Sequence, residues 1–184
     1  MPPVTERPDG KAILADSGLG ALTASGVLAT TADHIGIAVY DVAEAVSRYG
    51  RMFGIRHWRR VRFSAVAQYR GSVHRITGTA ATGSLGTVSI EVVAPGTGRW
   101  TATDVLAERG ECAYHVGFRV SDLTRALADC RAAGLTPTLI GTAENGDPAF
   151  SYLESPERTA VLIELVAETL SPSFLTEVTT TTVG

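Results

Sequence analysis

Two histidines and two glutamates occupy matching positions in two similar stretches of this chain. The first stretch runs from His34 to Glu91, and the second runs from His115 to Glu164. The histidines are 115 − 34 = 81 residues apart and the glutamates are 164 − 91 = 73 residues apart, so each stretch begins with an imidazole and ends with a carboxylate. Imidazole nitrogens and carboxylate oxygens are common ligands of divalent metals. The repeat predicts one metal site built from His34, Glu91, His115 and Glu164.

Each of the two glutamates lies inside an apolar run, residues 88–93 for Glu91 and 161–166 for Glu164. An ionised carboxylate among apolar neighbours is costly unless it is paired or binds a metal. Considered singly, each histidine is compatible with a core residue and each glutamate with a solvent-facing one. Considered as a set of four, they favour a metal. Two nitrogen and two oxygen ligands suit one divalent ion, namely Zn, Ni, Co, Mn or Fe(II).

The elements that position these residues follow the same order in both stretches. Alternating apolar residues from His34 to Tyr40 predict a strand, and Asp41 then caps a helical pattern that ends at Gly54. Each copy is therefore predicted to be a βαβββ unit, and the whole chain an α+β fold. The other elements are expected in the first copy at strands 57–69, 73–82 and 86–94, and in the second at strand 114–120, a helix from Ser121 or Asp122 to Gly134, and strands 136–142, 149–153 and 160–167.

The repeat also predicts how the chain is divided. We expect an N-terminal arm at residues 1–31 that is partly disordered, a first module at 32–98 and a second module at 99–168. A short helix near residues 104–109 should lead into the second module. Residues 169–184 are expected to form a frayed C-terminal tail, because their composition is polar and rich in threonine.

Composition excludes several classes of protein. Of 184 residues, 45% are hydrophobic and 19% are charged, which provides ample material for a core. The net charge of −3 lacks the basic excess of nucleic-acid-binding proteins. No apolar run reaches the roughly 20 residues of a membrane span, and the N-terminal residues lack the order of a secretory signal. Two cysteines, Cys112 and Cys130, are too few for a disulfide framework. We therefore predict a cytoplasmic protein with neither a membrane nor a nucleic acid as partner.

The histidine motifs carry a family resemblance. Residues 33–39 and 114–120, with Asp41 and Asp122 after them, resemble the vicinal oxygen chelate superfamily, which includes glyoxalase, methylmalonyl-CoA epimerase, extradiol dioxygenases and antibiotic-resistance proteins. Residues 150–156 and 163–166 are most similar to the glyoxalase and epimerase branch. The resemblance implies two tandem βαβββ modules, each curling into a half-barrel of a mixed sheet around a central metal. It also implies that His34, Glu91, His115 and Glu164 are the ligands.

The reaction that this branch shares is proton abstraction next to a carbonyl, with the metal as Lewis acid. The resemblance therefore implies a metal-dependent lyase or isomerase with Glu91 and Glu164 as catalytic residues. One carboxylate is expected to remain a ligand while the other also acts as base. The epimerases supply a further glutamate from the middle strands of the first module, whereas residues 56–88 of this chain contain no Asp or Glu.

Other side chains are candidates for contact with a small-molecule substrate. Gln68, Arg70 and His74 lie in the strands expected to curl over the metal, so they are predicted to bind substrate. Two alternative functions stay open. A non-catalytic binding or resistance protein would use the same concavity, and an Fe(II) extradiol dioxygenase would need a further histidine, for which His57 and His74 are the candidates. An exposed strand edge favours a homodimer.

Overall fold

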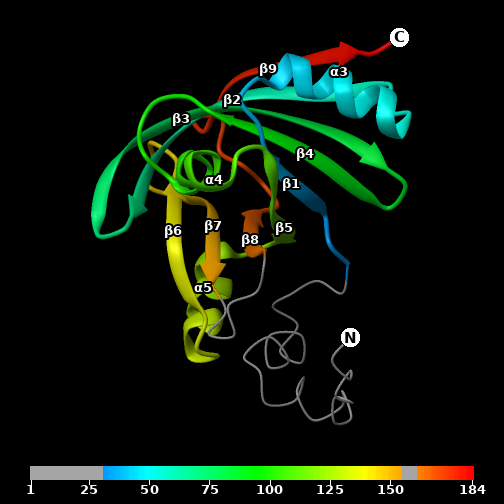
Figure 1. Cartoon of the computed structure of the whole chain (residues 1–184). Helices are drawn as coiled ribbons and strands as arrows, with labels where there is room; N and C mark the ends of the chain where they lie inside the picture. The colour runs from blue at the N-terminus through cyan, green and yellow to red at the C-terminus, as the bar shows by residue number, and fades with distance from the viewer. Residues whose placement is uncertain (1–30, 155–160) are drawn as a thin grey trace, which may run out of the picture.

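The structure is a computed structural model that describes residues 31–154 and 161–184 (Figure 1). The predicted N-terminal arm lies outside the described residues except for Thr31. Twelve elements follow one another in the described part of the chain: β1 (His34–Ala38), α3 (Val42–Phe53), β2 (His57–Tyr69), β3 (Ser72–Leu85), β4 (Val88–Pro95), α4 (Thr101–Arg109), β5 (Cys112–Val120), α5 (Leu123–Ala132), β6 (Thr136–Thr142), β7 (Pro148–Glu154), β8 (Leu162–Ala167) and β9 (Leu175–Thr182).

The strands form one curved sheet that closes into an eight-stranded barrel, with a ninth strand added at its seam (Figure 1). The strand order is β3-β4-β1-β5-β8-β7-β6-β2-β9, and β2 pairs with β3 as well as with β6, which closes the barrel. Strands β1 and β4 are parallel, as are β5 and β8, so the sheet is mixed. The predicted α+β class and curved sheet are confirmed. The element order β1-α3-β2-β3-β4 recurs as β5-α5-β6-β7-β8.

Helices α3 and α5 begin at equivalent aspartates. Asp41 and Asp122 each lie seven residues after a histidine (41 − 34 = 7 and 122 − 115 = 7). Their carboxylates accept hydrogen bonds from the backbone N–H of Glu44 and Arg125, both at 2.9 Å, and so satisfy donors that the first helical turn leaves free. The helices cover the outside of the barrel, α3 over β3 and β4 and α5 over β6, β7 and β8.

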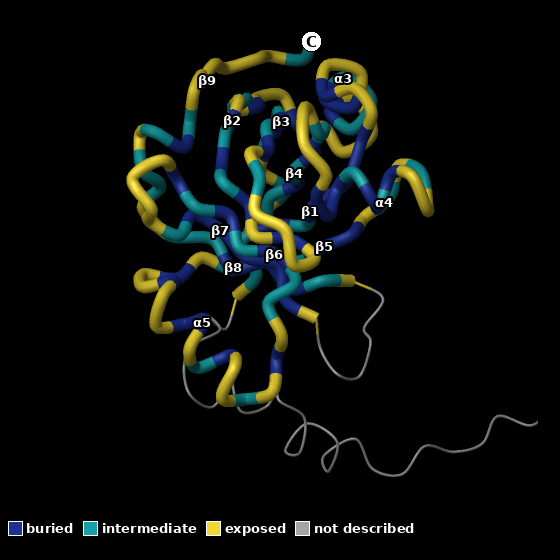
Figure 2. Tube along the Cα trace, turned by 90° about the vertical axis from the view of Figure 1, so that its left-hand side faces the viewer, coloured by how far each residue is buried: buried dark blue, intermediate teal, exposed yellow. Residues whose placement is uncertain are grey.

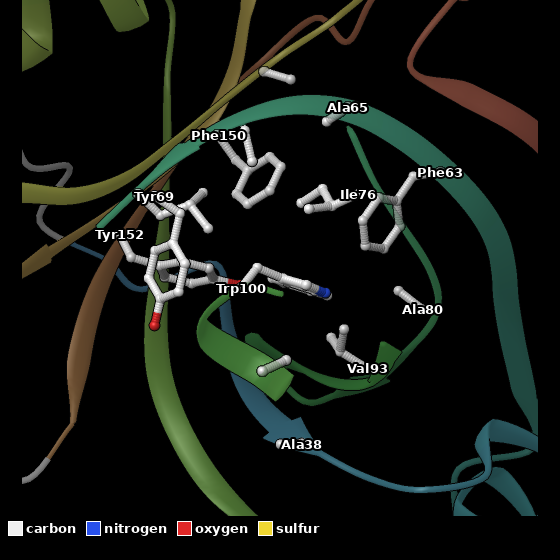
Figure 3. Packing of buried hydrophobic residues seen from close by; sticks show 14 of the residues in the cluster. Ala38, Phe63, Ala65, Tyr69, Ile76, Ala80, Val93, Trp100, Phe150 and Tyr152 are labelled. Carbon is white, nitrogen blue, oxygen red and sulfur yellow. The ribbon is translucent and has the colours of Figure 1, made fainter. Parts of the chain in front are cut away.

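Side chains alternate between the inside and the outside of the barrel. In β4, for example, Ile90 and Val92 pack outward with α3, while Glu91 and Val93 face inward. Aromatic rings dominate the interior at one end, where Phe63 lies 5.7 Å from Trp100 and 6.4 Å from Phe150 between ring centroids (Figure 3). Strands β1 and β5 lie in the buried centre of the molecule (Figure 2). This arrangement surrounds His34 and His115, which β1 and β5 carry, with apolar side chains.

The prediction of a frayed C-terminal tail is wrong. Strand β9 pairs antiparallel with the first half of β2, from His57 to Phe63. The pairing has a physical reason, because β6 covers β2 only from Val66 to Tyr69 and would leave the edge before it unpaired. Just before β9, Phe174 is buried and stacks on Phe63 with 5.5 Å between ring centroids. The polar composition of residues 169–184 predicted fraying, but one aromatic residue, Phe174, holds this segment against the barrel.

Among the described residues, no helix combines the length and apolar character that crossing a membrane requires.

Candidate metal centre

Four adjacent strands at the centre of the sheet each supply one member of the predicted quartet. Their order is β4, β1, β5 and β8, and they carry Glu91, His34, His115 and Glu164 respectively. The parallel pairing places Glu91 beside Gly36 of β1, and Glu164 beside Gly117 of β5. The structure therefore brings together all four residues that the repeat pointed to, although residue separations between them reach 130 positions.

The four side chains converge through one atom each. The Nε2 atoms of His34 and His115 lie 3.0 Å apart, and the Oε2 atom of Glu164 lies 2.8 Å from the first and 3.2 Å from the second. Oε2 of Glu91 is farther away, at 3.5 and 3.6 Å from the same two nitrogens. All four ligand atoms lie within 4.8 Å of one another. Glu164 is thus the closer carboxylate and Glu91 the looser one.

Two glycines make room for the histidine rings. The antiparallel pairing of β1 with β5 sets Gly36 opposite His115 and Gly117 opposite His34. A Cβ atom at Gly36 would lie 1.8 Å from Cε1 of His115, and one at Gly117 would lie 2.0 Å from Cε1 of His34. No side chain fits at those distances. Each histidine therefore depends on the glycine of the other stretch, which explains why His-x-Gly occurs in both.

His34 is held by a charged pair on the surface side of the site. Its Nδ1 atom lies 2.9 Å from Oδ2 of Asp33, and Oδ1 of Asp33 accepts a hydrogen bond of 2.8 Å from Nε of Arg119. Such an acceptor on the second ring nitrogen fixes the orientation of a ligating histidine and raises its basicity. The adjacent aspartate thus directs Nε2 of His34 into the site.

His115 is held by packing. The ring is fully buried, and its Nδ1 atom has no hydrogen-bond partner among the described residues. The centroid of the Tyr114 ring lies 4.4 Å from that of His115, and the centroid of Tyr152 lies at 5.3 Å. A bulge in β5 opposite Gly36 and Ile37 allows the consecutive residues Tyr114 and His115 both to face inward. Aromatic contacts therefore replace the carboxylate that supports His34.

The electrostatics of the quartet are strongly coupled. Burial disfavours a charge on His34, but the carboxylates of Glu91, Asp33 and Glu164 outweigh it and raise its pKa to about 11. Burial opposes the charge on His115 as well, and Glu164 with Glu91 nevertheless raises its pKa above the usual value. The two imidazoles in turn hold the pKa of the buried Glu164 well below its ordinary range. The site therefore favours two positive charges between two carboxylates.

These features fit a divalent metal. Bonds of about 2.0–2.2 Å to nitrogen and oxygen place neighbouring ligand atoms about 3 to 3.5 Å apart, close to the 2.8–3.6 Å found between the histidine nitrogens and their partners. A divalent ion would also bring the same charge as two imidazolium groups. His34, Glu91, His115 and Glu164 are the residues that would hold it.

A small pocket of about 90 Å³ opens beside the quartet. His34, Glu91 and Glu164 of the quartet line it, and these two glutamates are the only carboxylates in its wall as far as the described residues show. Arg59 and Arg119 add two guanidinium groups. The other lining residues are mostly apolar, and three of them come from the C-terminal segment that was expected to fray: Val61, Phe63, Ala80, Thr82, Val93, Trp100, Phe150, Tyr152 and Val166, with Leu170, Phe174 and Leu175. Charged and apolar side chains thus share the wall of this pocket.

The predicted substrate contacts lie elsewhere. Gln68 is exposed, Arg70 forms an ion pair with Asp104 at 3.1 Å, and Nε2 of His74 lies 2.6 Å from the backbone oxygen of Arg99. None of these three residues lines the pocket beside the quartet, and neither does His57. Their role in substrate binding stays a prediction. Strand alternation explains the placement of Gln68, which lies one position from the inward-facing Ala67.

Sequence reasoning missed several residues that shape the site. Asp33, Gly36 and Gly117 were visible as parts of the repeated motif, but no role followed from spacing alone. Arg119 and Phe174 had no signal in the sequence, because their contacts are formed with residues 86 and 111 positions away (119 − 33 = 86 and 174 − 63 = 111). Tertiary structure alone shows these partners.

Comparison with known proteins supports the assignment of the family. The sequence model of the glyoxalase/bleomycin resistance protein/dioxygenase superfamily matches residues 33–152, which is more than half of the chain. A search of curated proteins gives no match.

Several solved structures share the fold. Methylmalonyl-CoA epimerase from Mycobacterium tuberculosis matches with a TM-score of 0.52 and 24% identity, covering 78% of this chain and 91% of that chain. A variant of the Streptomyces coelicolor methylmalonyl-CoA epimerase, in complex with 2-nitronate-propionyl-CoA, matches with a TM-score of 0.51 and 24% identity over 77% and 99% of the two chains. A hypothetical protein from Bacillus halodurans matches with a TM-score of 0.53 and 18% identity over 77% and 96%.

At these identities the solved structures establish the fold alone, whereas the sequence match establishes the family. The chain belongs to the glyoxalase/bleomycin resistance protein/dioxygenase superfamily, the vicinal oxygen chelate superfamily that its two histidine motifs predicted.

Proposed function

We propose that this protein is a metal-dependent lyase or isomerase that removes a proton next to a carbonyl group. The observation that carries the proposal is the unequal pair of carboxylates in one apolar pocket. The Glu164 side chain is 6% exposed and lies within 3.2 Å of both histidine nitrogens, whereas the Glu91 side chain is 21% exposed and lies at 3.5 Å or more. Different surroundings give two carboxylates different roles.

The closer carboxylate is suited to a fixed ligand. Glu164 is buried and contacts both imidazoles, so turning toward a substrate would cost it both partners. Glu91 contacts the same nitrogens weakly and borders the pocket, so its carboxylate can turn toward a substrate carbon and take a proton. A divalent metal, when bound, supplies the Lewis acid that makes such a carbon acidic. We therefore assign the base to Glu91.

The size of the pocket points to a small reacting group. Its volume of about 90 Å³ is well below the roughly 300–1,000 Å³ of pockets that enclose drug-sized ligands. A larger substrate would therefore place only its reacting end beside the quartet and leave the rest outside. A substrate that fills this small pocket would displace water from it, which would strengthen the electrostatic interactions between substrate and protein. Acyl thioesters and thiol adducts of 2-oxo-aldehydes have reacting ends of suitable size.

The alternatives receive less support. The chain has four histidines, and the two outside the quartet, His57 and His74, do not line the pocket, so an extradiol dioxygenase would lack its additional histidine. A pure binding protein has no need for two buried imidazoles whose nitrogens lie within 2.8–3.6 Å of one another and of two carboxylates beside its pocket. An epimerase with a separate base from the middle strands of the first half finds no carboxylate there.

Metal content and proton exchange test the proposal together. Elemental analysis of the purified protein should find close to one equivalent of Zn, Ni, Co, Mn or Fe, and Glu164→Gln should lose it. The loaded enzyme should exchange the proton next to the carbonyl of acyl-CoA thioesters or 2-oxo-aldehyde adducts for deuterium, as mass spectrometry would detect.

Glu177→Gln, on the exposed strand β9, is the matched control and should keep both the metal and the exchange. A protein that neither contains metal nor takes it up on titration would refute the metal centre. Metal without exchange on either substrate class would leave a binding protein as the better interpretation.

Light scattering of the same preparations tests the predicted homodimer, which a monomer mass would exclude.

A further inference from the structure

Trp100 places a buried hydrogen-bond donor in the pocket beside the quartet. The residue is 1% exposed, and its Nε1 atom has no hydrogen-bond partner among the described residues. The nitrogen-bearing edge of the ring is directed toward Ala80 and Val93, both of which line the pocket (Figure 3). Buried indole N–H groups usually have a partner, because losing hydrogen bonds to water without replacement is unfavourable.

Local structure gives no reason for a tryptophan at this position. Trp100 is the residue that precedes the first turn of α4, where small polar side chains are preferred because they accept a hydrogen bond from the helix. An indole cannot accept such a bond. Its ring enters the barrel instead and packs against Phe63 and Phe150 at 5.7 and 6.4 Å between centroids. A phenylalanine would provide the same packing without the unsatisfied donor.

The other tryptophan of the chain provides an internal contrast. Trp58 is also fully buried, and its Nε1 atom donates a hydrogen bond of 3.1 Å to the backbone oxygen of Ile55. It lies in the cluster outside the barrel under α3, away from the pocket. The chain therefore satisfies the indole that has a structural role and leaves free the one that borders the candidate site.

The donor lies close to the proposed base. Val93 follows Glu91 by two positions on the same inward face of β4, a separation of about 7 Å along a strand. A molecule whose reacting carbon lies at Glu91 would therefore have atoms beside Trp100 only a few bonds away. Phe63, Ala80, Val93 and Phe150, all apolar, line the pocket with Trp100, and burying a charged group among such side chains is unfavourable.

We propose that Trp100 is a substrate-recognition residue whose indole N–H donates to an uncharged oxygen of the substrate. The substrate class that follows is a small acyl compound with a second, neutral oxygen acceptor, such as a ketone, ester or hydroxyl oxygen, within an apolar group near the reacting carbon. The inference deepens the proposed function, since it concerns what the same pocket binds. A compound lacking the acceptor leaves the donor unpaired and binds less well.

Two probes of equal shape test the donor directly. Diethyl ketone carries the acceptor, and the alkene in which a CH2 group replaces the ketone oxygen does not. In a nitrogen–proton correlation spectrum, the Trp100 indole proton should shift downfield with the ketone and much less with the alkene. The Trp58 indole signal should stay in place and serve as the control within the same spectrum. This titration uses the wild-type protein and needs no catalysis.

The variant Trp100→Phe completes the test. It should bind the ketone about 5- to 10-fold more weakly, the effect of one neutral hydrogen bond, and lose the preference for ketone over alkene. Equal shifts with both probes, no shift of the Trp100 signal with the ketone, or an unchanged preference in the variant would overturn the inference. If the indole shift appears but the metal-loaded enzyme exchanges no proton, the proposed reaction fails and the recognition role stands.

Discussion

The two halves of the molecule contribute the same pair of residue types to the site but hold them in different ways. In the first half, His34 is supported by Asp33, and Glu91 borders the pocket at 21% exposure. In the second half, His115 and Glu164 are enclosed, with aromatic rings around the imidazole and no partner for its Nδ1 atom among the described residues. A charged partner orients the histidine of the first half, whereas packing orients the histidine of the second half.

This difference matters because proton transfer requires both a stable site and a group that can move. Ligands held by close packing have few alternative positions, since protein interiors are packed to nearly crystalline density. A partly exposed carboxylate with longer contacts has more freedom. In the proposed function, the second half would therefore provide the fixed ligands and the first half the base, although the two sequences look like copies.

The largest expected effect comes from replacing each of the two glutamates by glutamine in a separate variant. Glu164→Gln should weaken metal binding by about 100-fold or more, because it removes a buried carboxylate that contacts both histidine nitrogens. Glu91→Gln should weaken it by only about 10-fold, yet slow proton exchange by about 100-fold or more. Cobalt titration followed by visible absorbance, with deuterium exchange alongside, measures both. Equal losses of affinity in the two variants would remove the distinction between the halves.

The C-terminal segment provides a second contrast, because β9 covers an edge of β2 in the first half. Phe174→Ala should lower the free energy of unfolding by about 3 kcal/mol, since it deletes a ring that stacks on Phe63 and contacts Phe150. Val178→Ala, at an exposed position of β9, should change it by less than about 0.5 kcal/mol. Urea unfolding distinguishes the two. Similar small effects would mean that the segment lies on the barrel without supporting it.

The paired glycines allow the halves to be compared by the same change. A methyl group at Gly36 or Gly117 overlaps the histidine ring opposite, so each alanine variant should cost about 1–3 kcal/mol of stability. Gly36→Ala should cost more, because it displaces the fully buried His115, whereas His34 lies beside the partly exposed Asp33. Thermal denaturation in chelator measures this, with Gly184→Ala, which has open space, as control. A larger loss of stability in Gly117→Ala than in Gly36→Ala would show that the ring of His34 is harder to displace than that of His115.

The smallest of these effects should come from the support of His34. Asp33→Asn should lower metal affinity by about 10-fold, because the amide supports the orientation and basicity of the imidazole less well. Arg119→Gln, which removes the donor to Asp33, should have a smaller effect. Calorimetric titration with zinc gives both values. An unchanged affinity in Asp33→Asn would mean that packing alone orients His34, as it does His115.

Much of the fold and the core of the site could be predicted from the sequence. The helices followed from Asp41 and Asp122 with apolar residues behind them, and the strands from alternation, because both signals depend on near neighbours in the chain. The quartet followed from the repeat, because residues at matching positions of two repeated units occupy matching places in the fold. The substrate contacts predicted at Gln68, Arg70 and His74 had no repeat behind them, and their role stays a prediction.

The sequence by itself determined the α+β class, the order of elements from β1 to β8 and the four residues that could bind a metal, because these depend on residue type, periodicity and internal repetition. Only the tertiary structure showed that His115 is packed while His34 is paired, that Glu91 is looser than Glu164, that β9 pairs with β2, and that the indole of Trp100 enters the pocket. The physical reason is that burial, contact distance and hydrogen-bond partners are properties of segments far apart in the chain. A local sequence pattern therefore does not predict burial, contact distances or hydrogen-bond partners, which are set only when the barrel closes.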